Sequence, residues 1–586
     1  MPTGSAPSAV SPPTNVEHPR LSKPIHDSRR LKVIAIGAGC SGLLIAYKLQ
    51  RSFENYELVV YEKNEDLGGT WHENRYPGCG CDVPAHTYTW SFEPKADWSA
   101  FYAGANEIHD YFKTVAVKYD LEKYIKYNHR VSRAEWNNRD GQWEVQVVDG
   151  DGNTKEDSCH ILINASGLLN SWKWPDIDGL HDFKGALLHT ARWDTSLDLS
   201  GKNVGLIGNG SSAIQVLPAV APIVDKVTTF IRSPAWVSPV HGQDQHIYTE
   251  EQIKTWSNDP QAHLHYRKIV ETQFSGIWPI FFKDSEMQKM TAAGISQMMK
   301  DKLNNKKLEE VLIPSTFGVG CRRITPGVGY LEAMGSEMVD VVVGDIQKIT
   351  ERGVVGGDGV ERPVDILICA TGFDTTSVPR FPIIGLDGKD IREEWKDESE
   401  SYFGIATNGF PNYFMIVGPS SPVAGGPVLV TFESQVDYIL KLANRWQTEN
   451  IHYVQPRMGA IKEFVEHRNA FMKNMVWSQN CRSWYKNKAA ADGNVTVIWP
   501  GSTLHFLEAM ADPRYEDWEF KYQGNRFAYL GNGYSQTESD PESDWAHYIR
   551  NQDDGPYLSR VKQLRAMNRK GRVVQPIPPE NGVKLL

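Results

Sequence analysis

The chain has 586 residues, of which 40% are hydrophobic and 23% are charged, and its formal net charge at pH 7 is −10. This length predicts several domains, and the acidic balance argues against a nucleic-acid-binding protein, whose binding domain is usually strongly basic. The seven cysteines are scattered and odd in number, so they predict reduced thiols in a cytoplasmic protein rather than a disulfide framework.

The most apolar stretch does not predict a membrane segment. Residues 407–432 carry no charge but contain eight glycines and prolines, which disfavour a spanning helix. Residues 1–29 are rich in proline, serine and charge and have no apolar run, so we expect a flexible leader without a secretory signal. Cys79-x-Cys81 has no second ligand pair at zinc spacing, so we expect no metal site.

The first nucleotide-binding signal begins with the apolar strand Lys32–Ile36. The turn Gly37-x-Gly39-x-x-Gly42 follows and leads into an apolar helix. Its glycines permit a tight turn and a close approach of the backbone to a pyrophosphate, which the helix N-terminus would face with free N–H groups. A second strand, residues 57–61, ends at Glu62, where a carboxylate can accept a hydrogen bond from a ribose hydroxyl. Together these features predict a site for FAD or NAD.

The next segment decides between these two cofactors. It reads G-G-T-W at residues 68–71, N-R-Y-P-G at residues 74–78, and then Cys81-Asp82. This run resembles the segment that borders the flavin in the Baeyer–Villiger monooxygenases, flavoenzymes that insert one oxygen atom beside a ketone carbonyl. The resemblance implies FAD and places Asp82 beside the flavin and a catalytic arginine; the alternative for Asp82 is a solvated loop acid. The residues expected to bind FAD are Gly37, Gly39, Cys40, Ser41, Gly42, Glu62, Lys63, Gly69, Thr70, Trp71, Tyr76, Asp82, Val83 and Tyr88.

The linking stretch, residues 183–194, joins the two nucleotide-binding signals and looks too irregular for a core helix or strand. Its spacing fits F-x-G-x-x-x-H-x-x-x-W-[PD], which resembles the fingerprint of the same family. Histidine titrates near neutrality, so a proton-transfer role for His189 is open. The resemblance instead implies a role in coupling the domains, which we favour. The fingerprint residues are Phe183, Gly185, His189, Trp193 and Asp194.

The second nucleotide-binding signal carries the opposite charge at the end of its second strand. The strand Asn203–Ile207 leads into Gly208-x-Gly210-x-x-Ala213 and a helix, and the next strand, residues 227–231, ends at Arg232-Ser233 instead of an acid. A guanidinium can bind a 2′-phosphate that a carboxylate would repel, so this site predicts NADPH. The residues expected to bind it are Gly208, Gly210, Ser211, Ser212, Ala213, Gln215, Arg232 and Ser233.

A helical segment and an arginine pair follow. Residues 249–312 mix charged and apolar residues at helical spacing, and G-V-G-C-R-R-I then ends in Arg322, Arg323 and Ile324. The family has a basic pair here, which implies that Arg322 holds the NADPH phosphate and Arg323 lies over the flavin. An always-charged guanidinium would stabilise the anionic 4a-peroxyflavin and the oxyanion of its ketone adduct. The alternative for Arg323 is a second phosphate contact. The strand ending at Cys369 leads into a further expected cofactor contact, Ala370-Thr371-Gly372.

These signals predict an α/β fold with two Rossmann-like dinucleotide-binding domains, for FAD and NADPH, and a helical insertion in the NADPH domain. The expected boundaries are a leader (1–29), the FAD domain (30–180), the linking stretch with the NADPH domain (181–240), the insertion (241–311), the rest of the NADPH domain (312–375), and the rest of the FAD domain with a C-terminal extension (376–586).

The predicted function is NADPH- and O2-dependent insertion of oxygen beside a ketone carbonyl, giving an ester or lactone. Residues 481–485 and 499–502 resemble a fungal-type branch of the family that oxidises bulky polycyclic or aromatic ketones. Two alternatives stay open: a flavin monooxygenase that oxygenates nitrogen or sulfur, and a non-catalytic flavin protein that recruits a partner. We expect a monomer or weak oligomer with no nucleic-acid partner.

Overall fold

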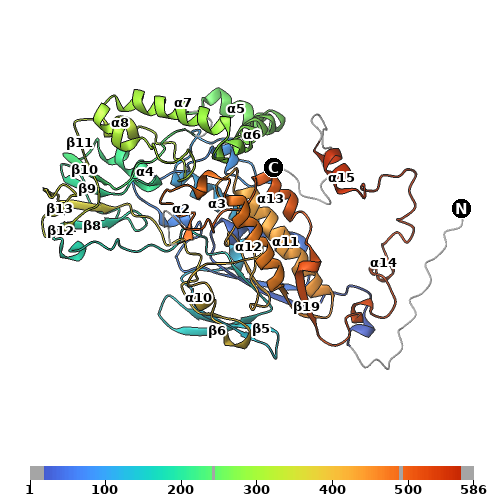
Figure 1. The fold of residues 1–586 in the computed structure, drawn as a ribbon. Helices are drawn as coiled ribbons and strands as arrows, with labels where there is room; N and C mark the ends of the chain where they lie inside the picture. Colours follow the sequence, from blue (N-terminus) through green and yellow to red (C-terminus); the bar gives the residue numbers. More distant parts are fainter. Residues whose placement is uncertain (1–18, 240–243, 488–492, 569–586) are drawn as a thin grey trace. The chain divides into compact units, whose positions relative to one another are not determined.

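The computed structural model describes residues 19–239, 244–487 and 493–568 (Figure 1). The chain divides into two compact units, Ser28–Tyr529 and a second one formed by the two ends of the chain. Most of the expected flexible leader, residues 1–18, lies outside the described residues. Within the second unit the backbone N–H of Ile25 donates to the carbonyl of Tyr534 at 2.9 Å, so these parts of the two ends are joined.

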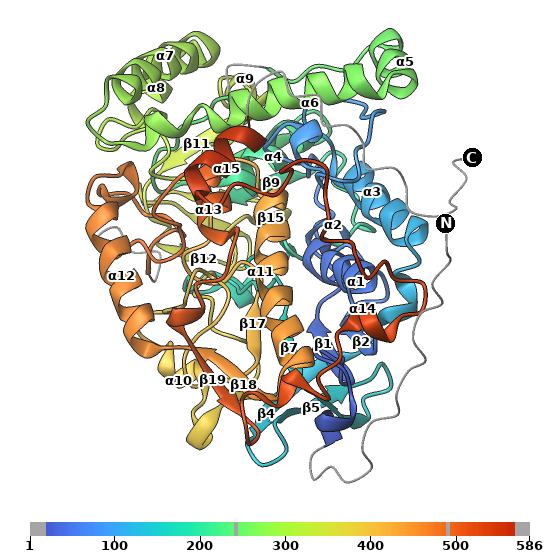
Figure 2. The same cartoon turned by 90° about the vertical axis from the view of Figure 1, so that its right-hand side faces the viewer.

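The first sheet is five-stranded and parallel, in the order β17 (Tyr413–Met415), β7 (Ile161–Asn164), β1 (Leu31–Ile36), β2 (Tyr56–Tyr61) and β3 (Ile125–Lys126). Its central strand β1 is buried almost throughout, as expected for a parallel strand covered on both faces. The helix α1 (Cys40–Ser52) follows β1 directly and contacts α11 (Leu429–Thr448), beside which it runs in Figure 2. This is the first predicted nucleotide-binding domain.

The second sheet is also five-stranded and parallel, in the order β11 (Val339–Val343), β10 (Lys226–Ile231), β9 (Asn203–Ile207), β15 (Ile366–Cys369) and β8 (Ala186–His189) (Figure 1). The helix α4 (Ser211–Val220) follows β9 as α1 follows β1. The predicted fold with two Rossmann-like domains is therefore confirmed.

The expectation of an irregular linking stretch was wrong in part, because four of its residues form the edge strand β8. Its residues pair in parallel with β15 from Ala186↔Ile366 to His189↔Cys369. Leu188 and His189 are buried, whereas Ala186 and Leu187 are half-buried. The strand is only four residues long and pairs with a single neighbouring strand, so its sequence gives little indication of a strand.

The predicted helical insertion lies between β10 and β11 and contains α5 (Glu250–Asn258), α6 (Pro260–Ser275), α7 (Glu286–Leu303) and α8 (Lys306–Leu312) (Figure 1). Each helix starts at a side-chain cap. Thr249 and Gln252 form a capping box for α5, and Asp259 accepts backbone N–H groups of α6 just before Pro260. Ser285 and Asn305 cap α7 and α8 in the same way. These caps satisfy donors that the first helical turn leaves free.

The remaining elements belong to one or the other of the two compact units. Two small sheets are ordered β16-β4-β5-β6 and β12-β13-β14, and β18 pairs with β19. The elements not yet placed are β4 (Arg130–Asn137), β5 (Gln142–Val148), β6 (Thr154–Cys159), β12 (Lys348–Ile349), β13 (Gly353–Val355), β14 (Glu361–Pro363), β16 (Ile383–Ile384), β18 (Ile451–Pro456), β19 (Trp518–Tyr522), α2 (Thr70–Glu73), α3 (Ala105–Lys118), α9 (Tyr330–Met334), α10 (Ile391–Glu394), α12 (Met458–Met472), α13 (Thr503–Met510), α14 (Gln536–Ser539) and α15 (Arg560–Met567).

The cysteine prediction was wrong at two positions. Cys321 and Cys481 form a disulfide with their Cα atoms 6.4 Å apart, although 160 residues separate them in the sequence. The other five cysteines are free thiols: Cys40, Cys79, Cys81, Cys159 and Cys369. The loop after the helical insertion meets a segment of the C-terminal part in the fold, and no local spacing of cysteines discloses such a pair.

Among the residues that the structure describes, no helix has both the length and the apolar character needed to cross a membrane. The uncharged stretch at residues 407–432 contains the short strand β17, and α11 begins only at Leu429, after Pro427. The glycines and prolines of this stretch lie outside the helices and strands.

The two glycine substitutions Gly42→Ala and Gly294→Ala should change stability in opposite directions. A Cβ at Gly42 in α1 would overlap the carbonyl oxygen of Gly37, whereas nothing lies within 4 Å of a Cβ at Gly294, which is exposed in α7. Alanine is favoured over glycine in a helix by about 1 kcal/mol. We expect a lower thermal unfolding midpoint for Gly42→Ala and a slightly higher one for Gly294→Ala; equal midpoints would contradict the close contact at Gly42.

Candidate active site

A cavity of about 1340 Å³ collects the predicted cofactor residues of both domains. Its lining includes every residue predicted to bind a cofactor except Gly42 and Ala213, together with Arg323. Gly42 and Ala213 instead lie inside α1 and α4 and are buried. These two positions therefore allow each helix to pack closely on its sheet. None of the five fingerprint residues lines the cavity.

Both glycine-rich turns leave the start of a helix bare. Gly39 and Gly210 are the N-caps of α1 and α4, and neither helix has a side-chain cap. Gly37 and Gly208, at the ends of β1 and β9, adopt left-handed backbone angles with φ of 102° and 126°. A Cβ at Gly208 would also collide with the carbonyl of Ala370. The free N–H groups of both helix starts are suited to bind phosphate oxygens.

Glu62 directly follows β2, as predicted, and is only 3% exposed. One carboxylate oxygen accepts the backbone N–H of Ala38 at 2.7 Å, and the other accepts that of Asn64 at 2.9 Å. Burial raises the pKa of Glu62, and these two hydrogen bonds oppose the rise. Each carboxylate oxygen keeps a lone pair, so the group can accept a ribose hydroxyl from the cavity. Nearby, Lys63 forms an ion pair with Glu73 at 2.7 Å.

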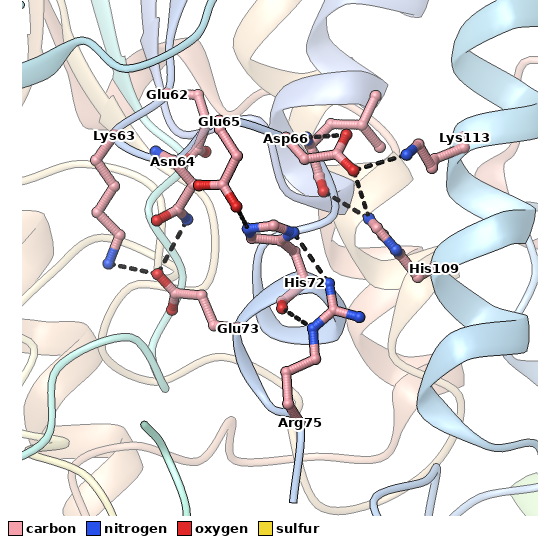
Figure 3. Close-up of polar contacts among 11 residues, drawn as sticks. Glu62, Lys63, Asn64, Glu65, Asp66, His72, Glu73, Arg75, His109 and Lys113 are labelled. Atoms are coloured by element: carbon pink, nitrogen blue, oxygen red, sulfur yellow. Dashed lines mark hydrogen bonds and ion pairs between the residues drawn. The ribbon is translucent and has the colours of Figure 1, made fainter. Parts of the chain in front are cut away.

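One group of possible metal ligands occurs among the described residues: Asp66, His72 and His109, whose ligand atoms lie within 4.8 Å of one another (Figure 3). These atoms already have partners. Asp66 pairs with the Lys113 ammonium at 2.6 Å, and Nε2 of His109 lies 2.8 Å from the carbonyl of Leu67. The Arg75 guanidinium contacts Nδ1 of His72 at 3.2 Å. Two adjacent cations oppose metal binding, so we interpret the group as a support for the G-G-T-W loop.

Arg232 occupies the position predicted for a 2′-phosphate contact. Its side chain is 58% exposed, and its Nε lies 3.9 Å from an Asp345 carboxylate that is itself 83% exposed. Such an exposed pair at this distance contributes little, so the guanidinium is available to an anion. Both residues line the cavity.

Arg322 supports the loop that carries Arg232. Its Nη1 donates to the Ser233 hydroxyl at 3.0 Å and to the Pro234 carbonyl at 2.7 Å, and its Nη2 donates to the Asn209 carbonyl at 3.2 Å. Burial lowers the pKa of Arg322, and the nearby Arg232 lowers it further. Much of its hydrogen-bonding capacity is therefore used within the protein. Any phosphate contact of Arg322 would add to this structural role.

Arg323 and Asp82 form a bidentate ion pair at the cavity wall. Nε of Arg323 lies 2.5 Å from one Asp82 oxygen, and Nη2 lies 2.7 Å from the other. The third nitrogen, Nη1, donates to the Val423 carbonyl at 3.1 Å. Burial disfavours the charge of Arg323, but Asp82 outweighs this effect and raises the arginine's pKa. The side chain is still 31% exposed, and since it lines the cavity, a permanently charged guanidinium faces that space.

A second polar link joins the two domains at the cavity wall. The Tyr76 hydroxyl donates to the side-chain oxygen of Gln215 at 2.7 Å, and the Gln215 amide donates to the Gly80 carbonyl at 2.9 Å. Gln215 lies on α4, whereas Tyr76 and Gly80 follow α2. Both side chains were predicted to bind a cofactor; the structure shows that they also bind each other across the domains.

His189, at the end of β8, is 1% exposed and stacks on Trp172 with 4.6 Å between ring centroids. Nδ1 accepts the backbone N–H of Ala191 at 3.1 Å, so Nε2 carries the proton and faces the Thr371 hydroxyl at 3.2 Å. Burial lowers the pKa of His189 to about 4. The imidazole is therefore neutral at physiological pH and ties β8 to the turn after β15.

The other fingerprint residues take structural positions. Phe183 is buried in an apolar cluster with Leu180 and Leu367, and its ring lies where a Cβ at Gly185 would be. Trp193 is half-buried. Asp194 is exposed and accepts the backbone N–H and the hydroxyl of Ser196 at 2.9 and 2.6 Å. The hydrogen bonds of Asp194 therefore stabilise the turn that follows β8 beside the second sheet.

Sequence reasoning did not single out several residues that surround Arg323. Val423 supplies the carbonyl described above, and the phenol of Tyr485, which is 2% exposed, interacts electrostatically with Arg323. Trp484 lines the same cavity. The run C-R-S-W-Y was noted as a family element, but only the fold shows that it reaches this arginine. Further apolar lining comes from Phe274, Ile277 and Phe281 of the insertion.

The sequence relatives identify the family. Residues 36–105 match the family described as NAD(P)-binding Rossmann-like domain. The chain is 42% identical over 520 residues to the FAD-binding monooxygenase moxY of Dothistroma septosporum, a match that covers 87% of this chain and 83% of the relative. It is 31% identical over 493 residues to a Baeyer–Villiger monooxygenase of Streptomyces coelicolor, covering 81% and 90%. The chain belongs to the Baeyer–Villiger monooxygenases.

Solved structures agree with this assignment. The closed crystal structure of cyclohexanone monooxygenase matches this Baeyer–Villiger monooxygenase with a TM-score of 0.73 and 26% identity, over 85% of this chain and 100% of that one. A crystal structure of the OTEMO complex with FAD and NADP gives a TM-score of 0.73 and 25% identity, over 84% and 100%. The family resemblance predicted from the G-G-T-W segment and the fingerprint is confirmed.

The buried His189 should make the monooxygenase acid-labile. In the unfolded chain this histidine gains a proton near pH 6.5, whereas the folded protein resists protonation down to about pH 4. Stability is therefore unaffected by this group above pH 6.5 and falls as the pH drops toward 4, by up to about 3 kcal/mol. The variant His189→Gln should lose less of its thermal midpoint between pH 7 and pH 5 than the wild type.

The control is His547→Gln, which changes an exposed histidine and should follow the wild type. Other histidines with lowered pKa values, among them the buried His86 and His263, remain in every variant, so only part of the acid sensitivity should disappear. Identical acid sensitivity of His189→Gln and the wild type would show that His189 is protonated in the folded state.

Proposed function

We propose that this Baeyer–Villiger monooxygenase binds FAD and NADPH in the cavity and uses O2 to insert one oxygen atom beside a ketone carbonyl, giving an ester or lactone. The observation that carries this proposal is the Arg323–Asp82 pair at the wall of a cavity that both glycine-rich turns line. Relatives described as FAD-binding monooxygenases and a neighbour complexed with FAD and NADP support it.

The residues present fit both cofactors. The first turn offers the bare N-terminus of α1 and the buried acid Glu62, which suit a pyrophosphate and a ribose hydroxyl. The second turn offers the bare N-terminus of α4 and the exposed Arg232, which suit a pyrophosphate and a 2′-phosphate. When bound, FAD supplies the electron transfer and the oxygen activation.

We assign to Arg323 the stabilisation of negative charge that develops on oxygen at the reacting carbonyl. Asp82 and the Val423 carbonyl fix the orientation of the guanidinium, so little reorganisation is needed during the reaction. Asp82 also keeps Arg323 charged despite burial. A guanidinium does not release its proton, so it can stabilise the anion without quenching it.

The substrate we propose is a bulky polycyclic or aromatic ketone. The cavity wall includes Phe274, Phe281, Phe432 and Trp484, whose rings can pack against a flat apolar molecule. We further propose that the enzyme works in the cytoplasm as a monomer or weak oligomer.

The direct test incubates the enzyme with NADPH, heavy-isotope O2 and a mixed panel of ketones and thioethers, followed by mass spectrometry. One heavy oxygen in an ester or lactone is the expected result. Label found only in sulfoxides would assign the enzyme to heteroatom oxygenation instead. NADPH that does not reduce the flavin at all would favour the non-catalytic alternative.

The variant Arg323→Ala should lose ester formation and keep NADPH-driven flavin reduction. Loss of a preorganised donor to an oxyanion costs about 10²–10³-fold in turnover. We expect a loss of this size in ester yield per NADPH, with electrons recovered as hydrogen peroxide. The control Arg352→Ala removes an arginine whose side chain is 82% exposed and should behave as the wild type. Ester formation by Arg323→Ala at the wild-type rate would disprove the assigned role.

The variant Arg232→Ala should weaken NADPH binding and leave NADH binding unchanged. A hydrogen bond to a charged group is worth about 1.5–3 kcal/mol, which corresponds to a rise of roughly 10–100-fold in the KM for NADPH. The initial rate of flavin reduction at varied NADPH and NADH measures this. Since NADH lacks the 2′-phosphate, an equal rise in both KM values would place Arg232 elsewhere than at that phosphate.

A further inference from the structure

A covalent link lies directly beside the arginine pair. Cys321 immediately precedes Arg322 and Arg323 in the sequence, and its sulfur bonds to Cys481, which lies four residues before Tyr485. We propose that the Cys321–Cys481 disulfide positions Arg323 by holding its loop against the segment 481–485, so that both cysteines are positioning residues for oxygen insertion. This inference rests on the proposed role of Arg323.

The loop 318–321 is held on two sides by hydrogen bonds, and the disulfide adds a covalent contact to it. On one side, Gln288 of α7 binds Val319 twice, through its side-chain oxygen at 3.0 Å and its amide at 2.9 Å. On the other side, the backbone N–H of Gly318 donates to the side chain of Gln479 at 2.7 Å. Such hydrogen bonds contribute about 1 kcal/mol each and can exchange with water. The disulfide makes the contact to residues 479–481 permanent.

The segment beyond Cys481 reaches the guanidinium itself. Tyr485 is 2% exposed, and its phenol lies close enough to the Arg323 guanidinium to interact with it electrostatically. Burial raises the pKa of Tyr485, and Arg323 opposes the rise, so the phenol remains protonated beside the cation. Arg323 is therefore held by Asp82, by the Val423 carbonyl and by Tyr485, which come from three separate parts of the chain. The disulfide fixes the distance between the arginine's own loop and the segment of Tyr485.

We expect the disulfide to affect the position of Arg323 more than the stability of the fold. A displacement of about 1 Å in a catalytic group can cost about 10²-fold in rate. If the link were absent, residues 318–323 could shift relative to residues 481–485 without unfolding either sheet. Cys321 and Cys481 are 0% and 3% exposed, so dissolved thiols have little access to the bond in the folded protein. The disulfide therefore stays intact in the folded protein and keeps the two segments joined.

Counting thiols tests the link without any activity. The purified protein, unfolded without reductant and treated with iodoacetamide, should gain five alkyl groups, because five cysteines are free. Treatment with dithiothreitol before alkylation should give seven, the number in the chain. A peptide map should show Cys321 and Cys481 in one cross-linked pair. Seven alkyl groups without reductant would overturn the proposal.

The double variant Cys321→Ala/Cys481→Ala tests the positioning. For holoenzyme with matched flavin content, we expect NADPH-driven flavin reduction within about twofold of the wild type and ester yield per NADPH at least about tenfold lower, with the difference appearing as hydrogen peroxide. The KM for NADPH should not change. A merely structural brace would lower the thermal midpoint and leave the ester-to-peroxide ratio unchanged, which would overturn the proposal.

Two further variants separate the outcomes. Cys159→Ala removes a buried free thiol on β6 and should keep the wild-type ester-to-peroxide ratio. Tyr485→Phe keeps the disulfide and should shift the ratio toward peroxide, so it tests the 481–485 contact even where the double variant yields no folded protein. A wild-type ratio in Tyr485→Phe would then count against the proposal. A wild type that makes no ester from any ketone would contradict the proposed function instead, while the thiol count would stand.

Discussion

The ion pair between Arg323 and Asp82 is the contact on which the arrangement of the site depends. Its two residues come from a loop that follows the helical insertion of the second domain and from the loop after α2 of the first. A partly buried guanidinium is costly unless it is paired, and here a bidentate carboxylate, a carbonyl and a phenol surround it. The pair can form only when the two sheets and the C-terminal segment are correctly placed.

The two sheets bring groups of opposite charge to the two ends of the cavity. Each sheet presents a glycine-rich turn with a bare helix N-terminus, so both ends attract a pyrophosphate. The next strand of each sheet then ends in a group of opposite charge, Glu62 in one and Arg232 in the other. In the proposed function, this difference distinguishes a dinucleotide with a free ribose hydroxyl from one with a 2′-phosphate. Arg323 lies in the same cavity as both of these turns, where the two cofactors would meet.

Local sequence signals predicted the parts of this arrangement that local physics determines. Strand, glycine turn and helix follow one another directly in the sequence, and the acid or base after the next strand is visible in the sequence as well. The prediction failed where formation depends on distant partners. The strand β8 exists because β15 lies beside it, and the disulfide exists because two loops 160 residues apart meet. Tyr485 belonged to a noticed motif, yet only tertiary structure brings it to Arg323.

Three cross-links between distant parts of the chain surround the cavity, and they differ in strength. The Tyr76–Gln215 hydrogen bond can break and re-form, and so can the His189–Thr371 contact, since neither involves a charged group. The disulfide cannot exchange in this way. The contact between the Arg323 loop and residues 481–485 is therefore the least exchangeable of the three.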